Sequence, residues 1–156
     1  MENYKTRQGI LALIDIVNFT GQANLLGNEY TAQYSQYFRE KIDSIVNKHG
    51  FRAIKFLGDA ALIFGQDPGK LLEIMLDLFE RDKPGDKFGF ISRFRLVAHS
   101  GYFQFKMKNR QPADLVSPEG IKVFRMEKEA SANELLVTRE LYQGLMSLLT
   151  PRNIEA

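Results

Sequence analysis

The stretch FRAIKFLGDAALIFG, residues 51–65, contains two apolar runs joined by Gly58 and Asp59. Two such runs separated by two turn-forming residues predict a β-hairpin. Because side chains alternate along a strand, we expect the odd-numbered residues of the first run, Lys55 among them, on one face and Ile54 and Phe56 on the other. In an isolated hairpin, Lys55 would face solvent and Asp59 would be an ordinary turn residue. Whether Lys55 and Asp59 also have a role in function must be judged from the rest of the chain.

The composition indicates one globular domain. A chain of 156 residues is the size of a single domain, and 44% hydrophobic with 26% charged residues is typical of soluble proteins. No apolar run approaches the ~20 residues that span a bilayer, and the polar N-terminus lacks the order of a secretory signal, so we expect a cytoplasmic protein without a membrane partner. The absence of cysteine excludes disulfides and thiolate sites, and a net charge of +2 gives no support for a nucleic-acid partner.

Strand and helix patterns alternate along the whole chain. The expected elements are, in order, a buried strand at 9–17, a helix at about 30–48, the hairpin at 51–65, a helix at 67–82 capped by Asp67, two strands within 90–108 joined near Ser100 and Gly101, a polar loop at 108–114, a helix beginning near Ser117 and Pro118, a short strand at 134–138 and a closing helix at 138–149. This order predicts one α+β domain over residues 1–156, with a ferredoxin-like sheet and helices on one face.

Four segments, in order and at matching spacing, resemble the catalytic domain of class III nucleotidyl cyclases, the adenylate and guanylate cyclases. The segments are ALIDIVNFTG (12–21), HGFRAIKFLGDAALIFG (49–65), FRLVAHSGYF (94–103) and DLVSPEGIKVFRMEKEAS (114–131). The resemblance extends over roughly residues 10–145. It implies the class III cyclase fold and a nucleoside triphosphate substrate.

The resemblance assigns two divalent cations, Mg²⁺ or Mn²⁺, to Asp15 and Asp59. Hard cations prefer carboxylates, and two of them can both activate an attacking hydroxyl and neutralise a triphosphate. A simpler interpretation of Asp15 as a strand-ending or helix-capping acid stays open. The turn after the first strand is assigned to phosphate binding through its backbone amides; it consists of Ile16, Val17, Asn18, Phe19 and Thr20.

The resemblance also implies base and transition-state contacts. Lys55 and Asp114 correspond to the family's purine-reading pair, whose donor and acceptor pattern matches adenine, so ATP is the expected nucleotide. Arg125 corresponds to the arginine that stabilises charge on the reacting phosphate. In the family the site lies between two protomers, which implies a head-to-tail homodimer. For all three residues, an ordinary solvated surface charge is the alternative.

The chain departs from the family pattern near Arg125. Ile121 stands where the family has an asparagine that orients the ribose, and the preceding positions hold Ser117, Pro118 and Gly120. The sequence also ends before the position of the family's C-terminal triphosphate lysine, so either the chain is truncated or another cation substitutes for it. The nearby candidates are Lys122, Lys128 and Arg139.

We therefore expect a phosphorus–oxygen lyase that converts ATP to cyclic AMP and pyrophosphate with low activity. The alternative is a catalytically degenerate, regulatory pseudo-cyclase that binds nucleotide without turnover. A third reading, an RNA-binding module based on the aromatic and basic stretch at 101–110, is disfavoured because its glycine–aromatic order does not match the RNA-recognition signature.

Overall fold

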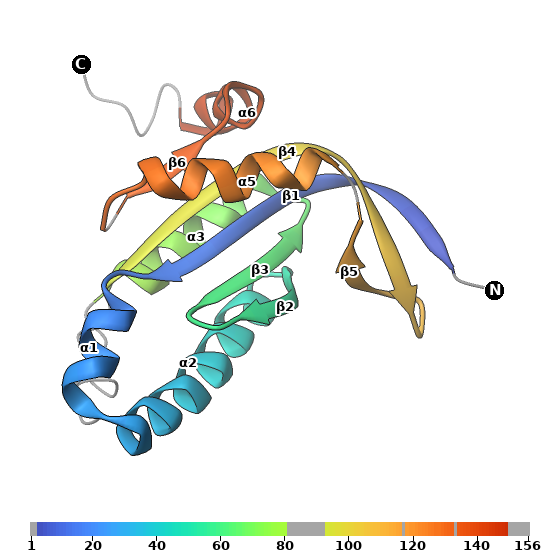
Figure 1. The fold of residues 1–156 in the computed structure, drawn as a ribbon. Helices are drawn as coiled ribbons and strands as arrows, with labels where there is room; N and C mark the ends of the chain where they lie inside the picture. The colour runs from blue at the N-terminus through green and yellow to red at the C-terminus, as the bar shows by residue number, and fades with distance from the viewer. Residues whose placement is uncertain (1–2, 81–92, 117, 133, 150–156) are drawn as a thin grey trace.

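A six-stranded sheet forms the centre of the structure, a computed structural model that describes residues 3–80, 93–116, 118–132 and 134–149 (Figure 1). The strand order is β2-β3-β1-β4-β5, and β6 pairs with β4 outside this path. The pairings are antiparallel except for that of β4 with β6. The strands are β1 (Tyr4–Ile16), β2 (Arg52–Leu57), β3 (Ala60–Gly65), β4 (Phe94–Lys108), β5 (Gln111–Leu115) and β6 (Leu135–Val137).

The long pair β1 and β4 is the frame of the sheet. The two strands pair along the whole of β1, from Tyr4 opposite Lys106 to Ile16 opposite Phe94. The other edge of β4 is shared, because β6 pairs with residues 96–98 and β5 pairs near the far end of the strand. One strand therefore contacts three partners.

Three helices cover one face of the sheet, which we call the helix-covered face (Figure 1). They are α2 (Asn28–Lys48), α3 (Pro68–Phe79) and α6 (Arg139–Leu149), preceded by the short α1 (Phe19–Leu26). Their buried residues recur at helical spacing, as an amphipathic helix requires. The core on this face includes Ile10, Ala12, Ile14 and Ile16 of β1, Tyr34, Phe38, Ile42 and Val46 of α2, and Leu71, Ile74 and Leu78 of α3.

A second core lies on the opposite face. It contains the intervening residues of β1, Leu11 and Leu13, together with Phe103 and Phe105 of β4 and Val123 of the short helix α5 (Ile121–Met126). Both faces of β1 are therefore buried in its second half, which explains why residues 10–16 are almost continuously apolar.

The predicted order of elements and the α+β fold class are confirmed, but some boundaries are wrong. No turn occurs at Ser100 and Gly101, because Gly101 pairs with Gly9 and the ladder continues through both. The turn lies instead at Asn109 and Arg110, and the expected loop contains strand β5. Helix α1 was not expected, and β1 begins at residue 4 rather than 9. The second helix is shorter than predicted, because it ends at Phe79 and Glu80 is extended. The loop expected after it, Ser117 and the segment after 149 lie outside the described residues.

A β-bulge changes the predicted faces of the hairpin. The register of β2 on β3 shifts between Ala53 and Lys55, which leaves Ile54 as an extra residue. Ala53 and Phe56 pack against the helix-covered core, whereas Ile54 packs on the opposite face. The prediction that Ile54 and Phe56 share a face is therefore wrong. Lys55 pairs with Leu62, which belongs to the core on the opposite face, so the bulge turns Lys55 to that face.

Within the described residues, no helix combines the length and apolar character needed to cross a membrane.

Candidate active site

Asp15 and Asp59 lie together where β1 ends beside the β2–β3 turn. Asp15 is opposite Ala60 in the β1–β3 ladder, and the backbone N–H of Ile16 donates to the carbonyl oxygen of Asp59 at 3.2 Å. Asp15 is buried, with 2% of its surface exposed, whereas Asp59 is half-buried. The structure thus brings together the two carboxylates that the sequence analysis assigned to metal.

Burial and neighbouring acidic groups raise the pKa values of both carboxyl groups. The pKa of Asp15 rises to about 6, mainly because the group is removed from water and also because Glu127 hydrogen-bonds to it, while Arg95 opposes the shift. The pKa of Asp59 is raised by burial first and by the charge of Asp15 second. Neighbouring carboxylates of this kind hold protons more tightly until a cation compensates their charge.

Arg95 is a site residue that the sequence analysis did not identify. Its guanidinium donates to Oδ2 of Asp15 through Nε at 2.7 Å and through a terminal nitrogen at 2.5 Å. The same terminal nitrogen lies 3.3 Å from Oε1 of Glu127. Arg95 is directly opposite Asp15 in the β1–β4 ladder, so the correct register of these strands would have revealed the contact.

The residues present fit a divalent cation that completes its coordination with a bound phosphate. Asp15 and Asp59 supply adjacent carboxylate oxygens, which suit Mg²⁺ held by one or two carboxylates and substrate phosphates. A closed protein cage is not available, because the described part of the chain holds no cluster of three or more His, Cys, Asp or Glu side chains suited to a metal. Arg95 occupies one oxygen of Asp15 and must share it or move when a cation binds.

Some backbone N–H groups of the predicted phosphate-binding turn already donate hydrogen bonds within the fold. The N–H of Ile16 donates to Asp59, and the N–H of Val17 donates to the carbonyl oxygen of Arg93 at 2.8 Å. Asn18 adopts the left-handed conformation, with a φ of 57°, and starts α1 without a side-chain cap. Phe19 and Thr20 are the first residues of that helix, where backbone N–H groups have no acceptor within the helix. The second half of the turn is therefore the part suited to an anion.

Lys55 and Asp114 meet on the face opposite the main helices. The ammonium nitrogen of Lys55 lies 3.1 Å from Oδ1 of Asp114, and the side chains are 40% and 46% exposed. The same oxygen accepts a hydrogen bond from the N–H of Leu115 at 2.8 Å, which fixes the carboxylate. The two residues come from strands β2 and β5, at opposite ends of the strand order, so the sheet curls enough to bring its edges together.

Arg125 extends from α5 as an exposed side chain, without a hydrogen bond or ion pair among the described residues. The turn that precedes α5 is fixed by His99, which is 2% exposed. Its Nε2 hydrogen-bonds with Glu119 at 2.9 Å, and its Nδ1 hydrogen-bonds with Thr138 at 2.9 Å. The helix carrying Arg125 is therefore connected to the sheet by a buried polar link.

Several solved structures of nucleotidyl cyclase domains superpose on this chain. The catalytic core of a rhodopsin-guanylyl cyclase with converted specificity, in complex with ATPαS, superposes with a TM-score of 0.78 at 19% identity, covering 96% of this chain and 86% of that one. This chain has the fold of a class III nucleotidyl cyclase catalytic domain.

Two further cyclase domains superpose over almost the same length. The adenylyl cyclase CyaB from P. aeruginosa gives a TM-score of 0.73 at 20% identity, covering 94% of this chain and 84% of that one. The guanylate cyclase domain from Catenaria anguillulae in complex with GTP gives 0.73 at 18% identity, covering 95% and 85%. No family model and no curated protein matches the sequence. The cyclase fold is thus retained at low sequence identity, among neighbours that include both adenylyl and guanylyl enzymes.

Proposed function

We propose that this chain is a cytoplasmic nucleotidyl cyclase domain that converts ATP to cyclic AMP and pyrophosphate as a head-to-tail homodimer. The observation that carries the proposal is the pairing of Lys55 with Asp114 at 3.1 Å, on a cyclase fold whose Asp15 and Asp59 also lie together. The Lys55–Asp114 pair is half exposed, and ion pairs of this kind add little stability. The Lys55–Asp114 pair suits recognition of the base, and the Asp15–Asp59 pair suits binding of the divalent cations that the reaction requires.

The Lys55–Asp114 pair supports adenine as the base. An ammonium group donates to a ring nitrogen, and a carboxylate accepts from an exocyclic amine, which is the pattern of the adenine edge. The two groups now satisfy each other, and a base inserted between them would take over both contacts. Because Asp114 is also fixed by the N–H of Leu115, the acceptor is positioned before the base arrives.

The Asp15–Asp59 pair supports binding of divalent cations with the triphosphate. Such cations, when bound, acidify the attacking 3′-hydroxyl and neutralise charge on the phosphates. Asp15 and Asp59 hold the cations, and the start of α1 donates N–H groups to the phosphates. Arg95, released from Asp15, is then a cation beside the same phosphates. Arg125 supplies charge to the reacting phosphate from the other protomer.

The decisive experiment incubates the purified protein with Mn²⁺ and each of ATP, GTP, CTP and UTP, and separates the products by chromatography. Cyclic AMP from ATP supports the proposal, and Asp59→Asn must abolish its formation. Conversion of GTP in preference to ATP would contradict the base assignment. Absence of a cyclic product from all four nucleotides would contradict the enzyme assignment.

Lys55→Ala tests the base contact separately from catalysis. Loss of one charged hydrogen-bond partner is expected to weaken binding of a non-hydrolysable ATP analogue by about 10- to 100-fold. Lys48→Ala, which removes a lysine that is 70% exposed at the end of α2, is the matched control. Equal affinity of Lys55→Ala and the wild type would show that the lysine does not contact the base.

Mixing of two inactive variants tests the dimer. In a head-to-tail arrangement, Asp59→Asn and Arg125→Ala damage opposite halves of each site. A mixed dimer then contains one site with both defects and one intact site, so an equal mixture should recover about a quarter of wild-type activity. If each site were built from one protomer, no activity would return.

The second candidate is a pseudo-cyclase that binds ATP without turnover, and it is favoured by Ile121 at the position of the ribose-orienting asparagine. If that substitution limits the rate, Ile121→Asn should raise the turnover rate more than it raises ATP affinity, as for an interaction made mainly in the transition state. An unchanged rate in a folded, ATP-binding variant would favour the pseudo-cyclase.

A further inference from the structure

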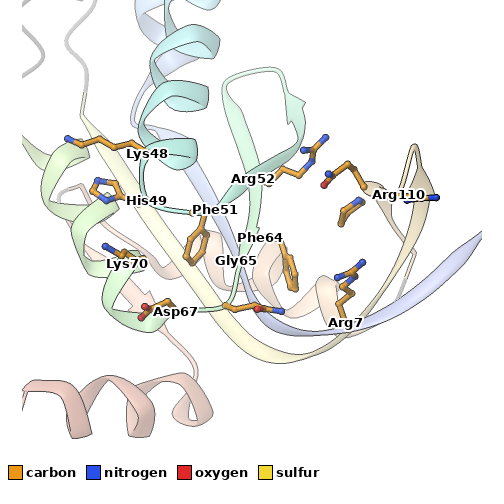
Figure 2. Close-up of a pocket in the computed structure, with 14 residues that line it drawn as sticks. Arg7, Lys48, His49, Phe51, Arg52, Phe64, Gly65, Asp67, Lys70 and Arg110 are labelled. Atoms are coloured by element: carbon orange, nitrogen blue, oxygen red, sulfur yellow. The ribbon is translucent and has the colours of Figure 1, made fainter.

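A cavity lies at the end of the sheet far from Asp15. It has a volume of about 570 Å³ and is lined by the start of β1, the end of β3, the end of α2 and the β4–β5 turn (Figure 2). Arg7, which lines it, precedes Asp15 by eight residues on the same strand, or roughly 26 Å at ~3.3 Å per residue. The cavity is therefore separate from the proposed nucleotide site.

The cavity walls carry an excess of positive charge. Arg7, Arg52 and Arg110 line it, and none of the three forms an ion pair with a described residue. We call this set the arginine pocket. Figure 2 shows Arg7 and Arg52 on the side of the cavity that is nearer the β4–β5 hairpin, with Arg110 on that hairpin. Each arginine comes from a different segment of the chain, so the fold gathers these charges.

The other charged groups around the cavity are already engaged. The carboxylate of Asp67 accepts a hydrogen bond from the N–H of Gly69 at 2.8 Å, as the cap of α3. Lys70 lies 3.1 Å from Glu73, and Lys48 lies 3.9 Å from Asp77. The three arginines are thus the charges that lack a counterion among the described residues of this cavity.

The turn that presents Arg110 is strained. Asn109 and Arg110 both have positive φ angles, 52° and 63°, and they connect β4 to β5 as a two-residue hairpin turn. Asparagine is common at the first position of such turns, but glycine is preferred at the second. A large side chain in this conformation has an energetic cost, and such strain is concentrated at sites with a function.

The base of the cavity is apolar and consists of buried aromatic rings. The rings of Phe51 and Phe64 line it and are 3% and 7% exposed. Gln66 and Gln111 add side-chain amides at the wall. A volume of this size, with an apolar base and a few charged donors, matches the usual character of a small-molecule site.

We propose that the arginine pocket binds a small molecule that carries a diphosphate group. Guanidinium groups bind phosphate oxygens in bidentate fashion, and three of them match the two to three negative charges of a diphosphate. A single carboxylate would neutralise one arginine only. The diphosphate can be free pyrophosphate or part of a nucleoside diphosphate, which share the recognised group. The site is independent of the proposed cyclase activity.

The test uses metal-free buffer with EDTA, so that the Asp15–Asp59 site cannot bind phosphate through a cation. Pyrophosphate and ADP are titrated into the full chain in separate experiments, followed by calorimetry and by amide chemical shifts. We expect saturable binding of at least one of them, with shifts at Gly65 and Gln66. The double variant Arg52→Gln/Arg110→Gln should bind at least about tenfold more weakly, since each arginine supplies charged hydrogen bonds.

The control variant Arg39→Gln/Lys41→Gln removes the same charge from the surface of α2 and should bind as the wild type does. Arg7 is left unchanged because its strand forms the frame of the sheet. Binding of pyrophosphate alone would identify the free anion, and stronger binding of ADP would identify a nucleotide. Equal weakening in both double variants, shifts confined to the Asp15 end, or an equal response to chloride at matched ionic strength would each overturn the proposal.

Discussion

Burial of Asp15 makes the stability of the fold depend on pH in a direction that is unusual for an aspartate. The pKa of Asp15 is raised from 3.8 to about 6 in the folded chain. A carboxyl group with a raised pKa stabilises the folded state while it is protonated. Its contribution is complete below about pH 4 and is lost as the pH rises through 6. With ~1.4 kcal/mol per pKa unit, a shift of about two units corresponds to about 3 kcal/mol.

Asp15→Asn isolates this contribution, because the amide is neutral at every pH. We expect the free energy of unfolding of the wild type, relative to Asp15→Asn, to fall by about 3 kcal/mol between pH 4 and pH 7. Urea denaturation followed by circular dichroism, at four pH values with EDTA present, measures this difference. Since Arg95 lowers the pKa of Asp15, Arg95→Met should move the transition to higher pH.

Two results would refute this reasoning. Parallel stability profiles of wild type and Asp15→Asn from pH 4 to pH 7 would show that Asp15 titrates alike in both states. A decrease of stability toward low pH in the wild type alone would mean that the ion pair with Arg95 outweighs burial. Asp43→Asn, which removes an exposed carboxylate from α2, controls for the loss of one charge.

Two further predictions concern packing and capping. A Cβ at Gly65 would lie 2.3 Å from the buried ring of Phe51, so Gly65→Ala should destabilise the fold by about 1–3 kcal/mol. At Gly144 in α6, a Cβ would have no neighbour within 4 Å, so Gly144→Ala should stabilise the fold by about 0.5–1 kcal/mol. Chemical denaturation of both variants measures the two changes in unfolding free energy. Asp67→Ala removes the cap on Gly69 and should cost about 1 kcal/mol of unfolding free energy, with Asp67→Asn retaining most of it.

The sequence allowed prediction of those parts of the fold that depend on local pattern. The cap at Asp67, the buried spacing of α2 and the meeting of Asp15 with Asp59 follow from motifs and from strand ends that share one edge of the sheet. The continuity of β4 through Gly101 could not be predicted, because it depends on pairing with Gly9 far away in the chain.

The charged contacts were predictable only in part, for a similar reason. Arg95 was overlooked because its contact with Asp15 requires the register of β1 on β4, which local sequence does not fix. Lys55 and Asp114 were expected at one site, yet the assigned alternation of the hairpin was wrong. The extra residue at Ile54 is accommodated by packing on both faces of β2, and nothing within the local pattern signals it.

The extra residue at Ile54 can be lost without changing which side of the sheet carries the lysine. Deleting Ile54 would place Lys55 directly after Ala53 and leave it opposite Leu62, so Lys55 would keep its face and its partner Asp114. The cost would fall on the packing of the opposite face, where Ile54 is 8% exposed. A related chain one residue shorter at this position can therefore present the same lysine to its ligand from a regular strand without the bulge.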